Sequence, residues 1–476
     1  MRTSVSVVGL GKLGACMAAA MASRGVMTVG VDVSDVAVAR VQRKLAPVFE
    51  PGLGELMAGL DGVLSARTDL ESAVHDTQIT FVVVPTPSNT QGAFSLEHVQ
   101  AAMTPIARAI RDKSSHHLVV LTSTVLPGST EFFVKPMLEG ISGKRCGCDF
   151  GLCYSPEFIA LGSVLRDFLN PDLLLIGECT ADAGKQLAGF YRDSLQMNAP
   201  AARVAPINAE LAKISLNSFV TTKITFANLL AEICERLPGG DVDAVTQALG
   251  LDQRIGAKYL RGALGYGGPC FPRDNNAFAR FLETMGVAAD LPRTVDRMNR
   301  RQAMRITSIV EQCNPGKSRR VAVLGLAYKP DTNVVEESQG IAIAGILAKQ
   351  GFEVSVFDPV AMEPAKGLLG DAVEYADSIA SCLRGAEVVV LATEWPEFRS
   401  VPSQLSKFRP RPIILDGWRM LKSGYGPDAL WYRGVGLEHP HRETRERLAR
   451  FVADLGEAPV EVEETNQAPG AKAAIG

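Results

Sequence analysis

Six residues near the start of the chain constrain the fold more than any other stretch. Residues 4–8 are a short, β-branched apolar run, and Gly9, Gly11 and Gly14 follow it at the opening of a helix-like stretch. Glycine at the first position permits a tight turn, at the second it lets a ligand approach the backbone, and at the third it lets helix and strand pack closely. The helix N-terminus then directs its N–H groups at an anion. The pattern predicts a β-α-β unit with a phosphate-binding turn.

An acidic residue at the end of the next strand narrows the choice of ligand. Asp32 follows an apolar run at 26–31 and stands 18 residues beyond Gly14. A carboxylate there accepts hydrogen bonds from a ribose hydroxyl and repels a 2′-phosphate, so the sequence favours NAD over NADP. A glycine-rich turn with an unrelated Asp is the less favoured interpretation. We expect the following residues to bind the cofactor: Gly9, Gly11, Lys12, Leu13, Gly14 and Asp32.

The rest of the chain is organised in three parts. Apolar strand-like runs alternate with helix-like stretches up to about residue 195, which indicates a parallel sheet covered on both faces. Residues 207–237 then form one helix-like stretch, about 46 Å long at 1.5 Å per residue. Shorter strands and helices alternate again after residue 314. Further helices are expected at 241–249, 256–262, 274–284 and 290–313.

We therefore expect an α/β protein with two Rossmann-like parallel-sheet domains joined by a helical domain with a long central helix. The expected bounds are 1–200 for the NAD-binding domain, 201–313 for the helical domain, 314–454 for the second α/β domain and 455–476 for a tail. The tail is rich in Glu, Ala, Pro and Gly, and we expect it to be disordered.

Charge and cysteine content exclude several classes of protein. The 49 Lys and Arg residues and the 52 Asp and Glu residues give a net charge of −3, so the chain lacks a broad basic field for nucleic acid. The sequence has no apolar run of the ~18 residues that a membrane helix needs and no signal-peptide core. We expect a cytoplasmic protein whose 9 cysteines stay reduced. We expect no metal, because no fourth ligand completes a zinc set with Cys146, Cys148 and Cys153.

One cysteine stands in an unusual context. Cys270 follows a glycine-rich stretch at 265–268 and precedes Arg273 and Asp274, where a helix is expected to begin. A thiol near a helix N-terminus and beside a cation tends towards the thiolate. Cys270 is the best candidate for a reactive cysteine, although the local sequence fits a buried structural cysteine equally well.

Four other polar residues could take part in chemistry. Lys213 and Asn217 are four residues apart on the long predicted helix, so they share a face and could hold an oxyanion. A solvated polar face is the commoner interpretation of such a pair. Glu157 and Thr124 each follow a strand, which is where α/β sheets place their ligand sites. Glu157 could act as a general base, and Thr124 could hydrogen-bond a ligand or a water molecule.

Taken together, these segments resemble the UDP-glucose/GDP-mannose dehydrogenase family over nearly the whole chain, from about residue 5 to 419. The matching motifs occur in the order that the family has. They are Gly9–Gly14 with Asp32, Phe49-Glu50-Pro51-Gly52-Leu53, Val84-Pro85-Thr86-Pro87, residues 123–128, Ser155-Pro156-Glu157-Phe158, residues 210–217, Gly267-Gly268-Pro269-Cys270 with Asp274, residues 324–329 and Asp416-Gly417. Within the family, residues 252–256 look most like the UDP-glucose dehydrogenases.

The resemblance implies a four-electron oxidation of the C6 alcohol of a nucleotide sugar to a carboxylate with two NAD⁺, with UDP-glucose as the expected substrate and UDP-glucuronate as the product. Cys270 would carry the sugar as a thiohemiacetal and then as a thioester. Glu157 would be the base for hydrolysis, and Lys213 and Asn217 would stabilise the oxyanion. Asp274 and Thr124 would position a water molecule.

The resemblance also implies further contacts and a partner. Additional cofactor contacts would be Thr86, Pro87, Thr124 and Arg273. Substrate contacts would be Glu157, Phe158, Lys213, Asn217, Arg254, Tyr259, Arg261, Gly265, Tyr266, Gly267 and Lys329. Arg254 would reach the site of a neighbouring subunit, so we expect a homodimer or larger homo-oligomer built on the long helix, with no nucleic-acid partner and no membrane insertion.

Three alternatives stay open. The substrate could be another nucleotide sugar, a UDP-N-acetylhexosamine or GDP-mannose. The chain could be a two-electron hydroxyacid-type dehydrogenase of similar domain plan, although that chemistry needs no cysteine. It could also bind a nucleotide sugar without catalysis, an idea motivated by departures from the family pattern at Ala37, Leu161 and Glu336. Trp418, where the family usually has Arg, is a further departure.

Overall fold

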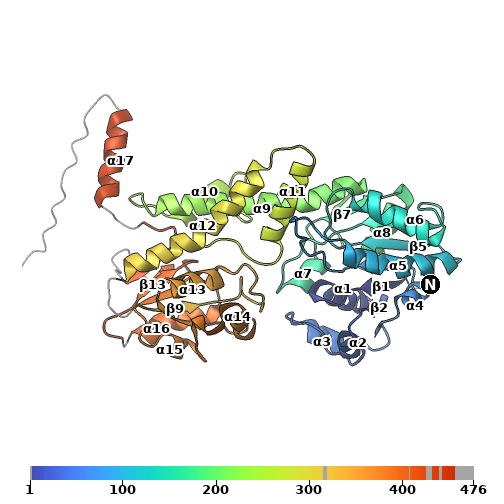
Figure 1. The fold of residues 1–476 in the computed structure, drawn as a ribbon, viewed down its shortest axis with the longest axis horizontal. Coiled ribbons are helices and arrows are strands. Elements are labelled where there is room, and N and C mark those ends of the chain that lie inside the picture. Colours follow the sequence, from blue (N-terminus) through green and yellow to red (C-terminus); the bar gives the residue numbers. More distant parts are fainter. Residues whose placement is uncertain (1–2, 315–318, 407, 425–430, 439–441, 456–476) are drawn as a thin grey trace, which may run out of the picture.

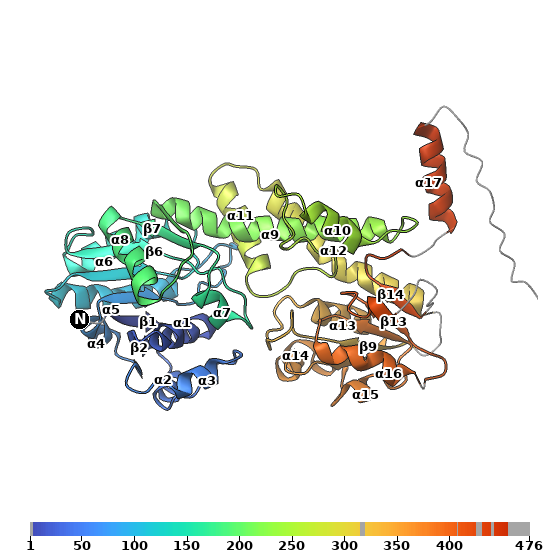
Figure 2. The ribbon, with the colours of Figure 1, turned by 180° about the vertical axis from the view of Figure 1, so that it is seen from behind.

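The computed structural model describes residues 3–314, 319–406, 408–424, 431–438 and 442–455 (Figure 1). Two α/β lobes lie at opposite ends of a bridge of helices, and the view from behind shows that their sheets share no layer (Figure 2). We call residues 3–204 the first lobe, residues 206–313 the central helices, and the described residues between 319 and 438 the second lobe. This arrangement confirms the predicted fold class.

The first lobe is built on one sheet of eight strands in the order β3-β2-β1-β4-β5-β6-β7-β8. All neighbours are parallel except β6 and β7. The chain leaves β1 towards one edge and returns through β4 towards the other, so a crevice opens at the carboxyl ends of β1 and β4, where such folds bind ligands. The strands are β1 (Ser4–Val8), β2 (Met27–Val31), β3 (Leu64–Arg67), β4 (Ile79–Val82), β5 (His117–Leu121), β6 (Phe150–Tyr154), β7 (Leu174–Glu178) and β8 (Ala201–Val204).

Helices cover both faces of this sheet (Figure 1). The strands can be apolar along their whole length because both faces are covered, and every residue of β4, β5 and β6 is buried. The helices are α1 (Lys12–Ser23), α2 (Asp35–Gln42), α3 (Leu53–Ala58), α4 (Leu70–Asp76), α5 (Glu97–Asp112), α6 (Lys135–Ser142), α7 (Val164–Leu169) and α8 (Ala181–Gly189). Two π-helical turns, η1 (Thr130–Val134) and η2 (Phe190–Ser194), precede α6 and follow α8.

The central helices begin with the long helix that the sequence predicts. This helix, α9 (Pro206–Cys234), has 29 residues and starts with a proline, which suits the first turn of a helix. It packs against β7 of the first lobe and against its three neighbours α10, α11 and α12. Those neighbours are α10 (Val242–Gly250), α11 (Phe271–Thr284) and α12 (Asp290–Cys313).

The helix that the sequence predicts at residues 256–262 does not form, so that prediction is wrong. Residues 256–262 form turns, in which Gly256 and Tyr259 have positive φ angles of 68° and 62°. A right-handed helix cannot include such residues.

The second lobe is a fully parallel sheet of six strands in the order β11-β10-β9-β12-β13-β14. Its strands are β9 (Arg320–Leu324), β10 (Glu353–Phe357), β11 (Glu374–Tyr375), β12 (Val388–Leu391), β13 (Ile413–Asp416) and β14 (Tyr432–Gly434). Its helices are α13 (Gln339–Lys349), α14 (Met362–Leu369), α15 (Ile379–Cys382) and α16 (Val401–Leu405), with short 3₁₀ turns at η3 (Gly370–Ala372), η4 (Pro396–Ser400) and η5 (Lys422–Gly424). The last described helix, α17 (Arg442–Leu455), follows outside the sheet (Figure 1). The expected tail lies outside the described residues, except for Leu455.

Both lobes have a glycine turn after their first strand, but the segment between the paired glycines is longer in the second lobe. Gly9 and Gly325 both follow the first strand of a sheet, with φ angles of 95° and 103°. A Cβ on Gly14 would lie 1.8 Å from the carbonyl oxygen of Gly9, and a Cβ on Gly340 would lie 1.9 Å from that of Gly325. In the second lobe, residues 326–339 separate the paired glycines and form a loop that reaches the first lobe. Lys12 Nζ donates a hydrogen bond to Asn333 Oδ1 of that loop at 3.0 Å.

The carboxylates that follow the second strands of the two sheets differ in their partners. Asp32 accepts one hydrogen bond on each oxygen, from the backbone N–H groups of Leu10 and Ser34. Asp358, its counterpart, is buried and accepts five. The donors are the backbone N–H groups of Leu326, Ala327, Val360 and Ala361 and the indole of Trp395. Asp358 therefore has no capacity left to hold a ribose in the way that Asp32 can.

None of the helices within the described residues combines the length and the apolar character that crossing a membrane requires.

Candidate active site

A cavity of about 810 Å³ opens at the carboxyl ends of β1 and β4, within the size range of ligand sites. Its wall contains most of the residues predicted to bind the cofactor. They are Gly9, Gly11, Lys12, Leu13, Gly14, Asp32, Thr86, Thr124 and Arg273. Pro87 is not in the wall, although its neighbour Thr86 is, and the hydroxyl of Thr86 donates to the carbonyl oxygen of Thr124 at 2.7 Å. The sequence did not predict the far wall, which α4 and α5 supply through residues 68–71, His98 and Pro105.

The residues of this cavity fit a dinucleotide. Gly11 is the N-cap of α1, and no side chain accepts a hydrogen bond from the first turn of that helix. A Cβ on Gly11 would meet no atom within 4 Å, so the space in front of the helix N-terminus is open to an anion. The hydrogen bonds from Leu10 and Ser34 hold the Asp32 carboxylate at the end of β2, in position for a ribose hydroxyl.

The predicted catalytic residues meet around Asp274, in the first turn of α11. Asp274 is 1% exposed, and its Oδ2 accepts a hydrogen bond from Asn217 Nδ2 at 2.6 Å. Its Oδ1 accepts two from the Arg273 guanidinium, at 3.1 and 2.9 Å. Its backbone N–H donates to the carbonyl oxygen of Cys270 at 2.8 Å, which places Cys270 at the N-terminal cap of α11. Two helices, α9 and α11, are thus joined at the candidate nucleophile.

Lys213 connects this group to the segment that follows β6. Its side chain is buried, and Nζ donates to the carbonyl oxygen of Glu157 at 2.5 Å and lies 4.5 Å from the centre of the Phe158 ring. Burial lowers the pKa of Lys213, while Asp274, Cys270 and Glu157 act to raise it. The structure therefore brings Lys213, Asn217, Cys270, Asp274 and Glu157 into one cluster.

Glu157 is the member of the cluster that also lines the cavity. Burial raises the pKa of its carboxyl group to about 7, although Lys213 acts to lower it. A carboxyl group with this pKa can accept or release a proton near neutral pH, which suits a general base.

The Cys270 thiol differs from the sequence-based expectation of a thiolate. Its side chain is exposed at the cluster, but the protein atoms around it and Asp274 raise its pKa, and this outweighs the opposing effects of Arg273 and Lys213. The neighbouring cations alone are not enough to ionise the thiol, because Asp274 and the loss of surrounding water oppose them.

The glycines before Cys270 serve to pack the loop against the second lobe. A Cβ on Gly267 would lie 2.4 Å from the carbonyl oxygen of Glu337, and one on Gly268 would lie 2.7 Å from the ring of Tyr328. The Gly268 N–H also donates to the carbonyl oxygen of Glu336 at 3.0 Å. The sequence suggested that these glycines make room for a ligand, whereas the structure shows them making room for the loop of 326–339.

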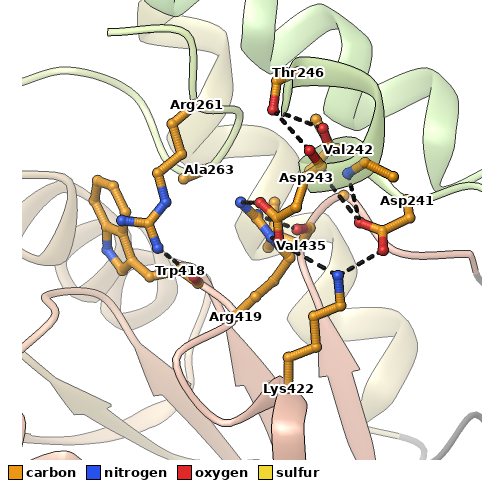
Figure 3. A network of polar contacts seen from close by, with 12 residues as sticks. Asp241, Val242, Asp243, Thr246, Arg261, Ala263, Trp418, Arg419, Lys422 and Val435 are labelled. Carbon is orange, nitrogen blue, oxygen red and sulfur yellow. Dashed lines mark hydrogen bonds and ion pairs between the residues drawn. The ribbon is translucent and has the colours of Figure 1, made fainter. Parts of the chain in front are cut away.

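One predicted substrate residue, Arg261, lies at the junction between the central helices and the second lobe, outside the cluster. The guanidinium of Arg261 lies 5.4 Å from the centre of the Trp418 ring, pairs with Glu394 and donates to the carbonyl oxygen of Trp418 (Figure 3). Beside this pair, Arg419 and Lys422 bind Asp243 and Asp241 at the start of α10 and fasten the second lobe to the central helices (Figure 3).

The remaining predicted substrate residues differ in how far they are buried. Tyr266 is buried and its hydroxyl accepts a hydrogen bond from Asn275 Nδ2, while Gly265 packs on Asn299 and Gln339. Tyr259 is exposed beside Phe271. Lys329 is half-buried; burial lowers its pKa, while Glu50, Asp167 and Asp331 act to raise it.

Arg254 is separate from the cluster. Its side chain is 88% exposed and pairs with Asp252 on the surface.

The positions that depart from the family pattern have ordinary structural surroundings. Ala37 lies in the first turn of α2, where its N–H donates to the hydroxyl of Ser34. Leu161 packs against the apolar core of the first lobe. The Glu336 side chain is exposed, and its contact with Gly268 uses only the backbone. The ring of Trp418 makes a cation–π contact with the guanidinium of Arg261.

Two buried carboxylates that hold the site in place were not predicted from the sequence. Glu210, on α9, accepts the N–H groups of Gly128 and Thr130 at 2.6 and 2.8 Å and so fixes the loop that follows Thr124. Glu50 accepts those of Gly162 and Val164 and fixes the turn that follows Glu157. Both lie in motifs that the sequence analysis quoted, but a carboxylate that binds distant backbone leaves no local signal.

Comparison with known proteins gives matches along almost the whole chain. Residues 3–195 match the NAD binding domain of the UDP-glucose/GDP-mannose dehydrogenase family, residues 207–301 its central domain and residues 322–423 its UDP binding domain. The chain is 35% identical over 427 residues to a UDP-glucose 6-dehydrogenase of Haloferax volcanii, which covers 89% of this chain and 98% of that protein. It is 34% identical over 360 residues to a GDP-mannose 6-dehydrogenase of Azotobacter vinelandii, which covers 74% and 80%.

A solved structure agrees with these matches. A UDP-glucose dehydrogenase from Pyrobaculum islandicum superposes with a TM-score of 0.82 and 36% identity, covering 92% of this chain and 98% of the other. The matches confirm the resemblance seen in the sequence and the NAD cofactor that the glycine turn and Asp32 predict. The chain belongs to the UDP-glucose/GDP-mannose dehydrogenase family.

Proposed function

We propose that the chain oxidises the C6 alcohol of UDP-glucose to the carboxylate of UDP-glucuronate in a four-electron reaction. One observation carries this proposal: Cys270 stands in one cluster with Lys213, Asn217 and Asp274, beside residues that line the cofactor cavity. A four-electron oxidation passes through an aldehyde that must stay bound until the second hydride leaves, and a thiol can hold it covalently. A two-electron dehydrogenase releases its carbonyl product and needs no such nucleophile.

The residues of the cluster have complementary tasks in this reaction. Bound NAD⁺ would accept a hydride from C6 in each of the two oxidation steps. Lys213, whose pKa is lowered by burial, accepts the proton of the alcohol. The Cys270 sulfur bonds to the carbon of the resulting aldehyde, the second carbon–oxygen bond opens, and the thiol proton passes to the oxygen to give a thiohemiacetal, whose oxygen accepts hydrogen bonds from Lys213 and Asn217. Loss of the second hydride from that carbon, with release of the hydroxyl proton to water, leaves a thioester.

Hydrolysis then releases the product. Glu157 takes a proton from a water molecule that Asp274 and Thr124 position, and the water oxygen attacks the thioester carbon. The carbon–sulfur bond breaks, and the sugar leaves as the carboxylate while Cys270 recovers its proton. Glu157 suits this step because its pKa of about 7 leaves a substantial fraction ionised at neutral pH.

Two observations favour UDP-glucose among the sugar nucleotides. The second lobe matches a UDP binding domain, and the UDP-glucose 6-dehydrogenase relative covers more of this chain than the GDP-mannose relative does. Lys329 and Arg261 are the cations proposed to meet the phosphates and the sugar.

Counting the NADH formed for each sugar tests the proposal. Purified protein with NAD⁺ and limiting UDP-glucose is expected to form two NADH per sugar, together with UDP-glucuronate. One NADH and a released aldehyde would point to a two-electron dehydrogenase, and binding of UDP-glucose without NADH would point to a protein that only binds. The same assay over a panel of UDP- and GDP-sugars identifies the preferred substrate, and UDP-glucose is expected to have the highest kcat/KM.

The pH dependence of turnover is expected to follow Glu157. A base acts when ionised, so kcat should rise with pH through about 7 and level off above it, and below pH 6 it should fall roughly tenfold per pH unit. Glu157→Gln is expected to lower kcat by about 10²- to 10⁴-fold and to remove this rise. Glu97→Gln, an exposed carboxylate on α5, serves as the matched control. A wild-type kcat that is constant between pH 5.5 and 8.5 would contradict the role of Glu157.

The central helix carries the surface that we propose joins two copies of the chain. Exposed apolar side chains occupy one face of α9 at helical spacing, and a large exposed apolar face of this kind marks an interface. They are Ile207, Leu211, Phe219, Phe226, Leu229 and Ile233. Exposed Leu251 and Ile255 stand beside Arg254 in the loop after α10, so a partner could carry Arg254 towards a neighbouring site.

Replacing Phe219 and Phe226 together with glutamate is expected to give a monomer, because the two charges would have to be buried in the interface. Light scattering after size-exclusion chromatography measures the mass. Phe132→Glu is the control, since Phe132 is even more exposed than Phe219 and Phe226 but lies on the first lobe. A double variant that keeps the mass of the wild type would exclude α9 as the interface.

A further inference from the structure

A second cavity, of about 430 Å³, lies where the end of α9, one face of α12 and strand β14 meet. It shares no lining residue with the cofactor cavity. Four arginines line it: Arg236 beyond the end of α9, Arg301 and Arg305 on α12, and Arg433 on β14. The cavity is therefore a basic pocket at the junction between the central helices and the second lobe.

The positive charge of this pocket is only partly neutralised by the protein. Glu235 is the carboxylate among the lining residues, and both of its oxygens are engaged, with Arg305 Nη1 at 2.8 Å and the Gly436 N–H at 2.9 Å. Arg236 and Arg301 share one carboxylate, that of Glu232. Among the residues that the structure describes, four guanidinium groups thus face two carboxylates, which leaves an excess of about two positive charges, counted at one charge per group.

Two of the arginines have N–H groups that find no acceptor, or only a weak one, among the described residues. The Arg305 side chain is 11% exposed, and its Nη2 is buried without a hydrogen-bond partner in the described part of the chain. The Nη1 of Arg433 contacts the sulfur of Cys313 at 3.6 Å, and a thiol sulfur is a weak acceptor. Buried guanidinium groups are normally satisfied by an anion, because leaving the N–H groups without an acceptor is costly.

We propose that this pocket binds the phosphate group of a small organic phosphate ester. Guanidinium groups match the oxygens of phosphate in a planar, two-point geometry, and a phosphate monoester carries close to the two negative charges that the pocket lacks. Gln312 lines the same pocket and offers a further donor, while Met304 and Ile309 provide an apolar wall for the organic part. The volume lies within the range of small-ligand sites.

The position of the pocket gives binding a structural consequence. A phosphate held by Arg433 and Arg301 would join β14 of the second lobe to α12. The end of α9, where the pocket lies, is about 32 Å from Lys213 along the helix at 1.5 Å per residue, so the pocket is separate from the proposed chemistry. A ligand there stabilises the junction between the central helices and the second lobe without entering the active site.

Calorimetric titration of the full chain with inorganic phosphate, and then with glycerol 3-phosphate, tests this assignment. Saturating NAD⁺ and UDP are present, so that phosphate at the cofactor turn and at the second lobe is displaced. Arg301→Gln and Arg433→Gln are each expected to raise the Kd at least tenfold. Arg305 is not replaced in this test, because its replacement would leave the buried carboxylate of Glu235 without its ion-pair partner. Arg300→Gln is the matched control, since Arg300 lies next to Arg301 on α12, pairs with Asp296 and does not line the pocket.

The outcomes separate the possibilities. Tighter binding of glycerol 3-phosphate than of phosphate supports an ester that uses the apolar wall. Absence of saturable binding of either probe, or an unchanged Kd in both arginine variants, overturns the proposal. A change of mass in the two variants would also overturn it, because the pocket would then be a contact between copies of the chain. The comparison is made between variants of the pocket, so it can succeed or fail independently of the proposed reaction.

Discussion

Replacing Cys270 with serine is expected to slow formation of the uronate by about a thousandfold or more, while the Kd for UDP-glucose stays within a few-fold of the wild type. The hydroxyl of serine occupies the same place but is a far weaker nucleophile, and a serine ester is hydrolysed less readily than a thioester. The contacts proposed for the nucleotide, at Lys329 and Arg261, do not use the Cys270 side chain and stay intact. Steady-state NADH formation gives kcat, and calorimetry with UDP-glucose gives the Kd.

The control for this experiment is Cys148→Ser, since Cys148 is also exposed but lies in the turn before β6. It is expected to match the wild type in both measurements. Near wild-type uronate formation by Cys270→Ser would exclude the covalent mechanism. Loss of UDP-glucose binding in that variant would show that Cys270 supports the loop instead of reacting.

A pair of alanine substitutions in the glycine turn is expected to separate folding from cofactor binding. In Gly14→Ala the new methyl group would lie 1.8 Å from the carbonyl oxygen of Gly9, so α1 has to move away from β1. We expect a loss of about 3 kcal/mol or more in the free energy of unfolding, together with loss of NAD binding. In Gly11→Ala the methyl group meets no atom within 4 Å, so the stability should change by less than about 0.5 kcal/mol.

Gly11→Ala should nevertheless raise the Kd for NAD at least tenfold, because its methyl group occupies the space that the pyrophosphate needs. Thermal unfolding and NAD titration measure the two effects. Gly54→Ala is the control: Gly54 lies in α3 with open space around it, and neither quantity should worsen. Gly11→Ala with unchanged NAD affinity would mean that the dinucleotide does not approach this turn.

The cofactor site was predictable because its parts are close in the sequence. The strand, the turn, the helix and Asp32 all fall within the first 32 residues, and each has a local physical reason for its residue types. The candidate catalytic cluster was harder to predict from the sequence. The spacing of Lys213 and Asn217 placed them on one face, but their partners Glu157 and Asp274 are more than 50 residues away, and only the resemblance to a known family brought them together.

Other features could not be predicted because their causes are tertiary. Strand β8 alternates exposed and half-buried residues at the sheet edge, so it lacks the apolar run that marked the buried strands, and the sequence analysis placed no strand between residues 195 and 207. The helix expected at 256–262 fails at Tyr259, whose positive φ has no signal in its side chain. The sequence did not decide whether Cys270 is exposed. The pKa of its thiol is raised by the surrounding protein atoms and by Asp274, which together act against the neighbouring cations.

The packing of Gly267 and Gly268 on Tyr328 and Glu337 has a consequence for how such proteins can be recombined. The loop that carries Cys270, the proposed nucleophile, is shaped by the second lobe, although it precedes that lobe in the chain and belongs to the central helices. A hybrid joined between them, near residue 314, would pair this loop with a foreign surface and misplace the thiol even if every domain folded. Exchange of sugar-recognition modules among relatives should therefore succeed only when residues 265–270 and 328–339 come from the same parent.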